Sequence, residues 1–137
     1  MKHKTVILTF LLLYSLSFKA QEVKDSIPRS YELKAPQYGA WKVLEQEWFA
    51  KEYHKILKEN KLKMNCNGCS SIYMITVITI DSTGKLTDHK VIKSRKCGDT
   101  FSKKLEDRFM KFFIDLKFPQ ELYNSKFEIS LGKGLKC

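Results

Sequence analysis

The residues best suited to chemistry in this chain are its four cysteines, Cys66, Cys69, Cys97 and Cys137. The first two form a Cys-x-x-Cys pair, a spacing that occurs in thiol-disulfide exchange proteins and in zinc sites. An even number of cysteines in an exported chain instead favours structural disulfides. Three chemistries therefore remain open: two disulfides, a redox-active Cys66/Cys69 pair, or a zinc site made by all four thiolates.

The compartment decides between these chemistries, and the first 20 residues predict it. Lys2 and Lys4 precede an apolar run from Val6 to Phe18, and Ala20 closes the segment. This pattern is typical of a secretory signal peptide, residues 1–20, that is removed on export. The run is shorter than the ~20 residues of a membrane-spanning helix, so no stable membrane insertion is expected after its removal. The predicted location is periplasmic or secreted, and it favours disulfides.

The elements that position the cysteines begin with a predicted hairpin. Residues 72–80 are almost all β-branched or aromatic and contain no Gly or Pro, which predicts a strand. Apolar residues occupy both parities of this run, so we expect a central strand that is covered on both faces. A turn at 81–84 contains Asp81 and Gly84 and leads to a more polar second strand at 85–93.

The remaining elements are predicted from their periodicity. Residues 21–36 are polar and contain two prolines, which indicates a flexible lead-in before a domain that spans 37–137. A helix is expected at 37–61, and its core residues recur at steps of three and four: Trp41, Leu44, Trp48, Phe49, Tyr53, Ile56 and Leu57.

A second helix and a third strand complete the domain. Asp99 or Thr100 is expected to cap this helix, and Phe118-Pro119 to end it. Its apolar stripe comprises Phe101, Leu105, Phe109, Phe112 and Leu116. The last strand, 126–131, alternates side chains, so that Phe127, Ile129 and Leu131 face the core while Lys126, Glu128 and Ser130 face outward.

These elements predict an α+β fold with a three-stranded sheet, antiparallel or mixed, in the order 2-1-3. The second helix carries the chain from strand 2 across to the far side of strand 1, which leaves the last strand at an edge. The start of strand 1 then lies beside the ends of strands 2 and 3, and all four cysteines gather at one end of the sheet. Pairing each of Cys66 and Cys69 with one of Cys97 and Cys137 fits best, but the sequence does not decide the connectivity.

The sequence gives little support for catalysis. It contains no Gly-rich phosphate loop, no zinc-binding helix motif and no serine nucleophile elbow, so we expect no enzyme, no cofactor and no metal. Removal of residues 1–20 takes away three lysines and no acid, so the net charge falls from +10 to +7, which favours anionic partners in principle. The basic residues are interleaved with acids, however, and a solvated basic surface is expected in place of a nucleic-acid site.

The hairpin and the end of the chain resemble the C-terminal domain of the TonB family. The matching positions are Asp81, Gly84, Leu86, Asp88, Val91 and Ser94, followed by a helix, by Leu116-Lys117-Phe118-Pro119 and by the strand 126–131. The resemblance implies a periplasmic module that binds proteins. It also implies that the edge of the last strand, Lys126, Phe127, Glu128, Ile129, Ser130 and Leu131, pairs with a short extended peptide, such as a segment of an outer-membrane receptor in TonB-dependent transport.

Three features depart from the TonB pattern: a removable signal replaces the permanent anchor, a long Pro-rich spacer is missing, and His89 stands at a position that is usually apolar. We therefore expect the domain to bind partners without transmitting energy. The alternative function is a periplasmic thiol-disulfide redox or metal-binding protein that uses Cys66 and Cys69. A third possibility is a basic module for nucleic-acid or lipid surfaces, which would bind in a steeply salt-dependent way. The sequence does not indicate an oligomeric state.

Overall fold

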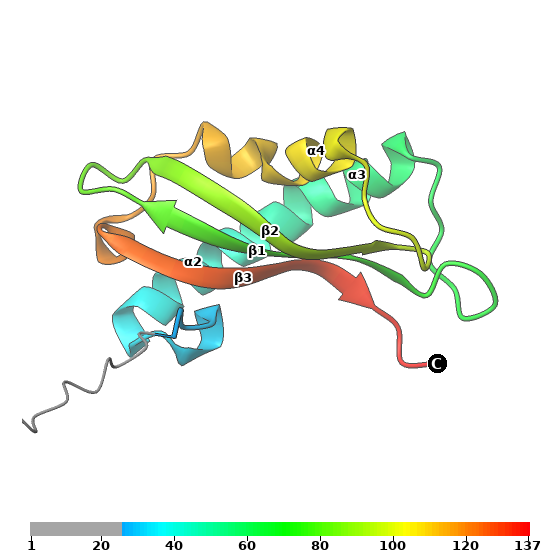
Figure 1. Ribbon diagram of the computed structural model, residues 1–137, viewed down its shortest axis with the longest axis horizontal. Helices are drawn as coiled ribbons and strands as arrows, with labels where there is room; N and C mark the ends of the chain where they lie inside the picture. The colour runs from blue at the N-terminus through cyan, green and yellow to red at the C-terminus, as the bar shows by residue number, and fades with distance from the viewer. Residues whose placement is uncertain (1–25) are drawn as a thin grey trace, which may run out of the picture.

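The computed structural model describes residues 26–137, in which helices pack against a three-stranded sheet (Figure 1). The predicted signal peptide lies outside the described residues. Among residues 26–137, no helix combines the length and the apolar character needed to cross a bilayer. The elements follow in the order η2 (Ser30–Glu32), α2 (Ala35–Trp48), η3 (Phe49–Tyr53), α3 (His54–Glu59), β1 (Ser71–Ile80), β2 (Leu86–Lys96), α4 (Lys103–Ile114), η4 (Gln120–Leu122) and β3 (Ser125–Gly134).

The sheet confirms the predicted α+β class and strand order. β1 lies in the centre, with β2 on one side and β3 on the other, and both pairings are antiparallel. α4 connects β2 to β3 across the sheet, as expected of the crossover helix (Figure 1). Because β1 has neighbours on both sides, β2 and β3 are both edge strands.

Asp81 fixes the turn between β1 and β2. Its carboxylate accepts hydrogen bonds from the backbone N–H of Thr83 at 2.8 Å and of Lys85 at 3.0 Å, and from the Thr83 hydroxyl at 2.7 Å. The Lys85 N–H, followed by the Thr83 hydroxyl, lowers the pKa of this carboxyl below its ordinary value. The ionised carboxylate therefore stabilises the folded state above the unfolded pKa, and this contribution is lost as the pH falls through the lower folded pKa.

The prediction that β1 is covered on both faces was wrong. The face that includes Ile72, Met74 and Ile78 is fully buried. On the opposite face Val77 is buried, but Tyr73 and Ile75 are only half-buried. The helices lie together on one side of the sheet (Figure 1), so only neighbouring side chains shield the other face. Apolar residues at both parities therefore do not require two covering layers here.

The predicted helix 37–61 is one continuous helical segment from Ala35 to Glu59, but it is not uniform. It begins two residues before the prediction because Pro36 stands in the first turn, where a missing N–H costs nothing. Between α2 and α3 the chain makes a π-helical turn, Phe49–Tyr53. The buried residues Trp48 and Tyr53 are five positions apart, and the wider turn places both on the core side.

α4 differs from its prediction at both ends. Its N-cap is Ser102, whose hydroxyl accepts from the Leu105 N–H at 3.3 Å. Asp99 cannot serve as the cap because its backbone pairs with Lys96 in a tight turn. The helix ends at Ile114, so Leu116 lies beyond it, and Phe113 takes the buried place that was predicted for Phe112.

Candidate functional site

The structure places the predicted edge residues 126–131 inside β3, Ser125–Gly134. Phe127, Ile129 and Leu131 are buried against the helices, while Lys126 and Ser130 are exposed and Glu128 is half-buried. One side of β3 pairs with β1 along its whole length. The other side forms a margin of the sheet, to which no further strand is added within residues 26–137.

The backbone of Glu128 points away from β1. Its N–H donates to the carbonyl oxygen of Pro28 at 2.9 Å, on the outer side of β3. In an antiparallel pair, alternate residues direct their backbone groups to opposite sides of the strand. Lys126 and Ser130 therefore also direct their N–H and C=O groups outward, whereas Phe127, Ile129 and Leu131 direct theirs to β1. These outward groups are the ones that can pair with an added strand.

The lead-in predicted to be flexible makes contacts with this edge at its end. Arg29 and Glu128 form an isolated parallel bridge, and their side chains form an ion pair with Nε and Oε1 3.7 Å apart. Leu33 then packs against the core, before α2 begins. Sequence reasoning missed this pairing because a single backbone bridge requires no apolar periodicity. The one available signal was Pro28, which favours extended backbone in the residue before it.

The exposed face of the sheet carries basic side chains beside the half-buried Tyr73 and Ile75. Lys93 places its Nζ 5.9 Å from the Tyr73 ring centroid. Lys90 and Arg95 lie on the same face of β2, opposite Val77 and Tyr73. None of these three cations forms an ion pair with the residues that the structure describes. This face is solvated and positively charged.

The four cysteines gather at one end of the sheet and form two disulfides, as predicted. Cys66 bonds to Cys137, with Cα atoms 5.5 Å apart, and Cys69 bonds to Cys97, with Cα atoms 4.2 Å apart. Cys66 and Cys69 therefore belong to different bridges, and the alternative of a redox couple between them is not what the structure shows. The bridges use all four sulfurs, so none is left as a thiolate for the zinc alternative.

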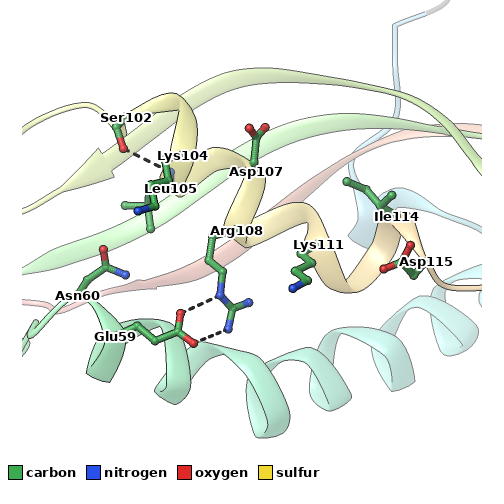
Figure 2. A pocket seen from close by; sticks show the side chains of 10 residues that line it. All are labelled: Glu59, Asn60, Ser102, Lys104, Leu105, Asp107, Arg108, Lys111, Ile114 and Asp115. Carbon is green, nitrogen blue, oxygen red and sulfur yellow. Dashed lines mark hydrogen bonds and ion pairs between the residues drawn. The ribbon is translucent and has the colours of Figure 1, made fainter.

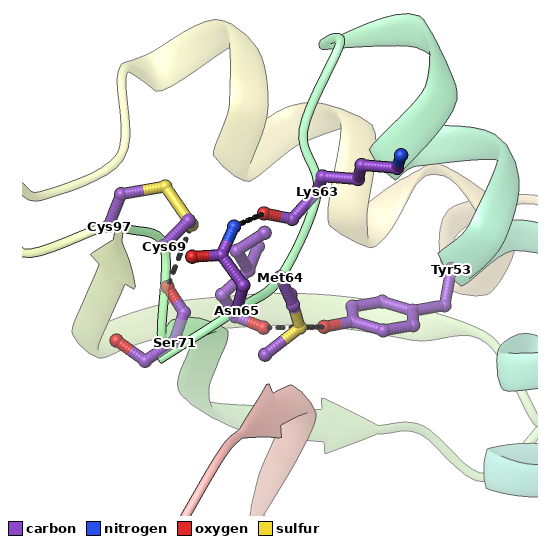
Figure 3. Close-up of a disulfide and its surroundings, with 8 residues drawn as sticks. Tyr53, Lys63, Met64, Asn65, Cys69, Ser71 and Cys97 are labelled. Carbon is purple, nitrogen blue, oxygen red and sulfur yellow. Dashed lines mark hydrogen bonds between the residues drawn. A yellow bond between two sulfur atoms is a disulfide. The ribbon is translucent and has the colours of Figure 1, made fainter. Parts of the chain in front are cut away.

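The Cys69–Cys97 bridge lies against the start of β1 (Figure 3). The Cys69 sulfur is 3.9 Å from the Ser71 carbonyl oxygen, which is a contact and not a hydrogen bond because a disulfide sulfur carries no hydrogen. Nearby, the Tyr53 hydroxyl donates to the Ile72 carbonyl at 3.1 Å and also lies 3.2 Å from the Met64 sulfur. Burial raises the pKa of Tyr53, which keeps this hydroxyl protonated as a donor.

Removing the inner bridge should cost more stability than removing the outer one, even though the outer bridge closes the longer loop, 71 against 28 residues. Cys69 is buried and joins the ends of the central hairpin, whereas Cys66 and Cys137 are exposed. We expect the paired replacement Cys69→Ser/Cys97→Ser to lower the free energy of unfolding by about 2–4 kcal/mol. Cys66→Ser/Cys137→Ser is the matched control, with the same chemistry at a solvated site. Urea unfolding under non-reducing conditions measures both, and a larger loss for the outer pair would contradict this ranking.

A groove of about 590 Å³ lies between the end of α3 and α4 (Figure 2). Arg108 crosses it and donates to both carboxylate oxygens of Glu59, at 2.8 and 3.1 Å, and to Glu52 at 2.8 Å. The Arg108 guanidinium holds the pKa of Glu59 below its ordinary value. Because the Arg108 guanidinium already pairs with two carboxylates, the cluster joins α4 to η3 and α3, and this guanidinium is not free to bind an anionic ligand.

Comparison with known proteins adds a likeness to one solved structure. No known protein family matches the sequence, and no curated protein matches it. The solution structure of the C-terminal domain of Helicobacter pylori TonB is similar over 69% of this chain and 94% of that chain, with 16% identity and a TM-score of 0.33. The α+β architecture of this chain is defined by its own strand order and register.

Proposed function

We propose that this chain is an exported, non-enzymatic binding module that pairs with extended peptides along the outer edge of β3. One observation supports the proposal most directly: Glu128 directs its backbone N–H outward on an edge strand and already pairs there with an extended segment. Backbone hydrogen bonds of this kind supply affinity to an added strand. The side chains of Lys126, Glu128 and Ser130, on the sheet face away from the helices, supply selectivity. The resemblance of residues 72–131 to the TonB C-terminal domain adds an outer-membrane receptor segment as a candidate partner.

The proposed compartment is the periplasm or the extracellular space. Two disulfides are stable in an oxidising environment, and such bridges are rare in reducing compartments. The separate pairing of Cys66 and Cys69 gives no support to the redox alternative. The proposed role is therefore partner recognition related to TonB-dependent transport, without energy transduction.

The decisive variant replaces an outward N–H on β3 without disturbing the β1 side. Ser130→Pro removes one outward donor, and an edge strand tolerates proline on its solvent side. We expect it to weaken binding of peptides selected on a random peptide array by about 5- to 10-fold, the effect of losing one hydrogen bond. Fluorescence polarisation with a selected peptide measures the change, and Ser130→Ala, which keeps the N–H, is the matched control.

Lys126→Pro tests the same edge at a second outward position. Ile129→Pro is not equivalent, since the Ile129 backbone faces β1 opposite Thr76 and its loss damages the sheet itself. Circular dichroism establishes that both edge variants stay folded. Unchanged affinity in folded Lys126→Pro and Ser130→Pro would remove the strand-addition proposal.

A further inference from the structure

The segment around Arg29 occupies the middle of the proposed binding edge. The Pro28 carbonyl accepts the Glu128 N–H, and the backbones of Arg29 and Glu128 form a parallel bridge. Glu128 is the central member of the three outward residues 126, 128 and 130. An incoming peptide cannot pair with this N–H while Pro28 accepts it, because one donor in this geometry serves one strand.

The side chains at this bridge are complementary in charge. The Arg29 guanidinium lies 3.7 Å from the half-buried Glu128 carboxylate. Glu128 is the one acidic residue among the six edge residues 126–131. An extended segment that places a basic side chain opposite Glu128 therefore satisfies both the backbone and the charge of the edge.

The segment from Pro28 to Glu32 makes few contacts with β3, and several contacts join its own residues to one another. Within the segment, the Arg29 N–H donates to the Glu32 carboxylate at 2.7 Å, and the Glu32 N–H donates to the Arg29 carbonyl at 2.8 Å. Arg29 also contacts the Tyr31 ring and hydroxyl. One backbone hydrogen bond joins the described segment to β3, so local opening breaks little. Leu33, packed on the core, keeps the segment near the edge when it opens.

We propose that the β3 edge selects an extended peptide with a basic residue opposite Glu128, and that the chain's own Pro28–Arg29 is the occupant that this peptide must displace. The inference rests on the proposed function, since it names the partner chemistry and the internal competitor of the same edge. Its observable consequence is that weakening the Arg29–Glu128 pair frees the edge for an external basic peptide. Reversing both charges restores the internal pair.

Hydrogen–deuterium exchange of the full chain tests the internal occupant. In the parent, the Glu128 amide should exchange more slowly than the outward amides of Lys126 and Ser130. Arg29→Glu and Glu128→Lys should each reduce this difference, because they weaken the ion pair that supports the backbone hydrogen bond, and the double variant should restore it. Arg95→Glu, which makes the same charge change on β2, is the matched control and should leave Glu128 protection unchanged. Equal exchange of the three amides in the parent would overturn the inference.

Peptide binding tests the partner chemistry with a defined probe, the blocked heptapeptide Ser-Ile-Pro-Arg-Ser-Tyr-Glu that copies residues 26–32. We expect it to bind the Arg29→Glu chain at least ~5-fold more tightly than the parent, because the internal competitor is repelled from Glu128. Glu128→Lys should lose this binding and should instead bind the probe with Glu in place of Arg. Equal affinity for parent and Arg29→Glu overturns the inference.

The outcomes separate the inference from the proposed function. If selected array peptides lose affinity on Ser130→Pro while the heptapeptide shows no preference for Arg29→Glu, edge binding stands and the inference fails. If the selected array peptides bind Lys126→Pro and Ser130→Pro as tightly as they bind the parent, the edge is not a binding site, and both the proposed function and the inference fail. A dimer that forms with increasing concentration and disappears on Arg29→Glu would assign the segment to a second copy, which overturns the intramolecular occupant.

Discussion

Replacing Trp48 with alanine is expected to lower the free energy of unfolding by about 3–5 kcal/mol, the usual cost of deleting a fully buried tryptophan. Trp48 is completely buried, and its ring lies 5.1 to 5.6 Å, between centroids, from Phe49, Tyr53 and Phe109. Its Nε1 donates to the Phe109 carbonyl at 3.2 Å, which joins α2 to α4. The substitution therefore leaves a cavity between α2 and α4. Urea unfolding with the disulfides intact measures the lost free energy of unfolding.

Trp41 provides a matched control for the hydrogen-bond part of this effect. It is also completely buried, but its Nε1 has no hydrogen-bond partner within the described part of the chain. Both Trp→Phe changes remove similar apolar volume, and only Trp48→Phe also removes a hydrogen bond. We expect Trp48→Phe to cost about 1 kcal/mol more than Trp41→Phe. An equal or larger loss at Trp41 would contradict the role assigned to the Phe109 contact.

Gly132→Ala is expected to destabilise the chain by more than about 3 kcal/mol, the combined cost of backbone strain and overpacking. Gly132 lies in β3 opposite Tyr73 with a φ of +104°, a conformation that favours glycine. A Cβ at this position would lie 2.2 Å from the Ile72 carbonyl oxygen and 2.7 Å from the Tyr73 Cα. Neither backbone atom can move without breaking the β1–β3 pairing. Thermal unfolding should show a large drop in Tm.

Gly98 separates the two costs. Its φ is +94°, close to that of Gly132, but no atom lies within 4 Å of a Cβ built on it. Gly98→Ala should therefore cost only the backbone strain, about 1–2 kcal/mol. If Gly132→Ala and Gly98→Ala lower the free energy of unfolding equally, the close approach of β1 to β3 at Gly132 adds nothing to the cost of the substitution.

The strand order and the cysteine cluster could be predicted from the sequence because both follow from strong signals. The β-branched run that became β1 is too short and too branched for a helix. A helix between strand 2 and strand 3 favours the order 2-1-3. Antiparallel pairing of β1 with β2 brings Cys69 near Cys97 at the open end of the hairpin. The connectivity itself needed coordinates, because either cross-pairing places the sulfurs at the same end of the sheet.

The π-helical turn has a signal in the sequence, but a search for the 3.6-residue period of an α-helix does not detect it. The buried residues of the first helical segment step by three and four, except for the step of five from Trp48 to Tyr53. An α-helix would turn one of these residues away from the core. Burying both Trp48 and Tyr53 removes enough apolar surface from water to stabilise the wider π-helical turn.

The segment at the β3 edge could not be predicted, because the interaction that places it is made by backbone atoms. Pro28 accepts a hydrogen bond through its carbonyl, a group that every residue has. The ion pair between Arg29 and Glu128 joins residues that are far apart in the sequence, and neither stands in a charge pattern that indicates the other. The outward direction of the Glu128 backbone depends on register, which only the β1–β3 pairing defines.

The nested arrangement of the two disulfides also has a consequence for biosynthesis. On the proposed export route, a chain that enters the oxidising compartment from its N-terminus presents Cys66, Cys69 and Cys97, with the β1–β2 hairpin, before β3 and Cys137 follow. Until Cys137 follows, Cys66 has only two possible partners, Cys69 and Cys97, and both are incorrect. Early closure of the inner bridge removes both of those partners and leaves Cys137 as the remaining partner within the chain for Cys66 when the last strand docks.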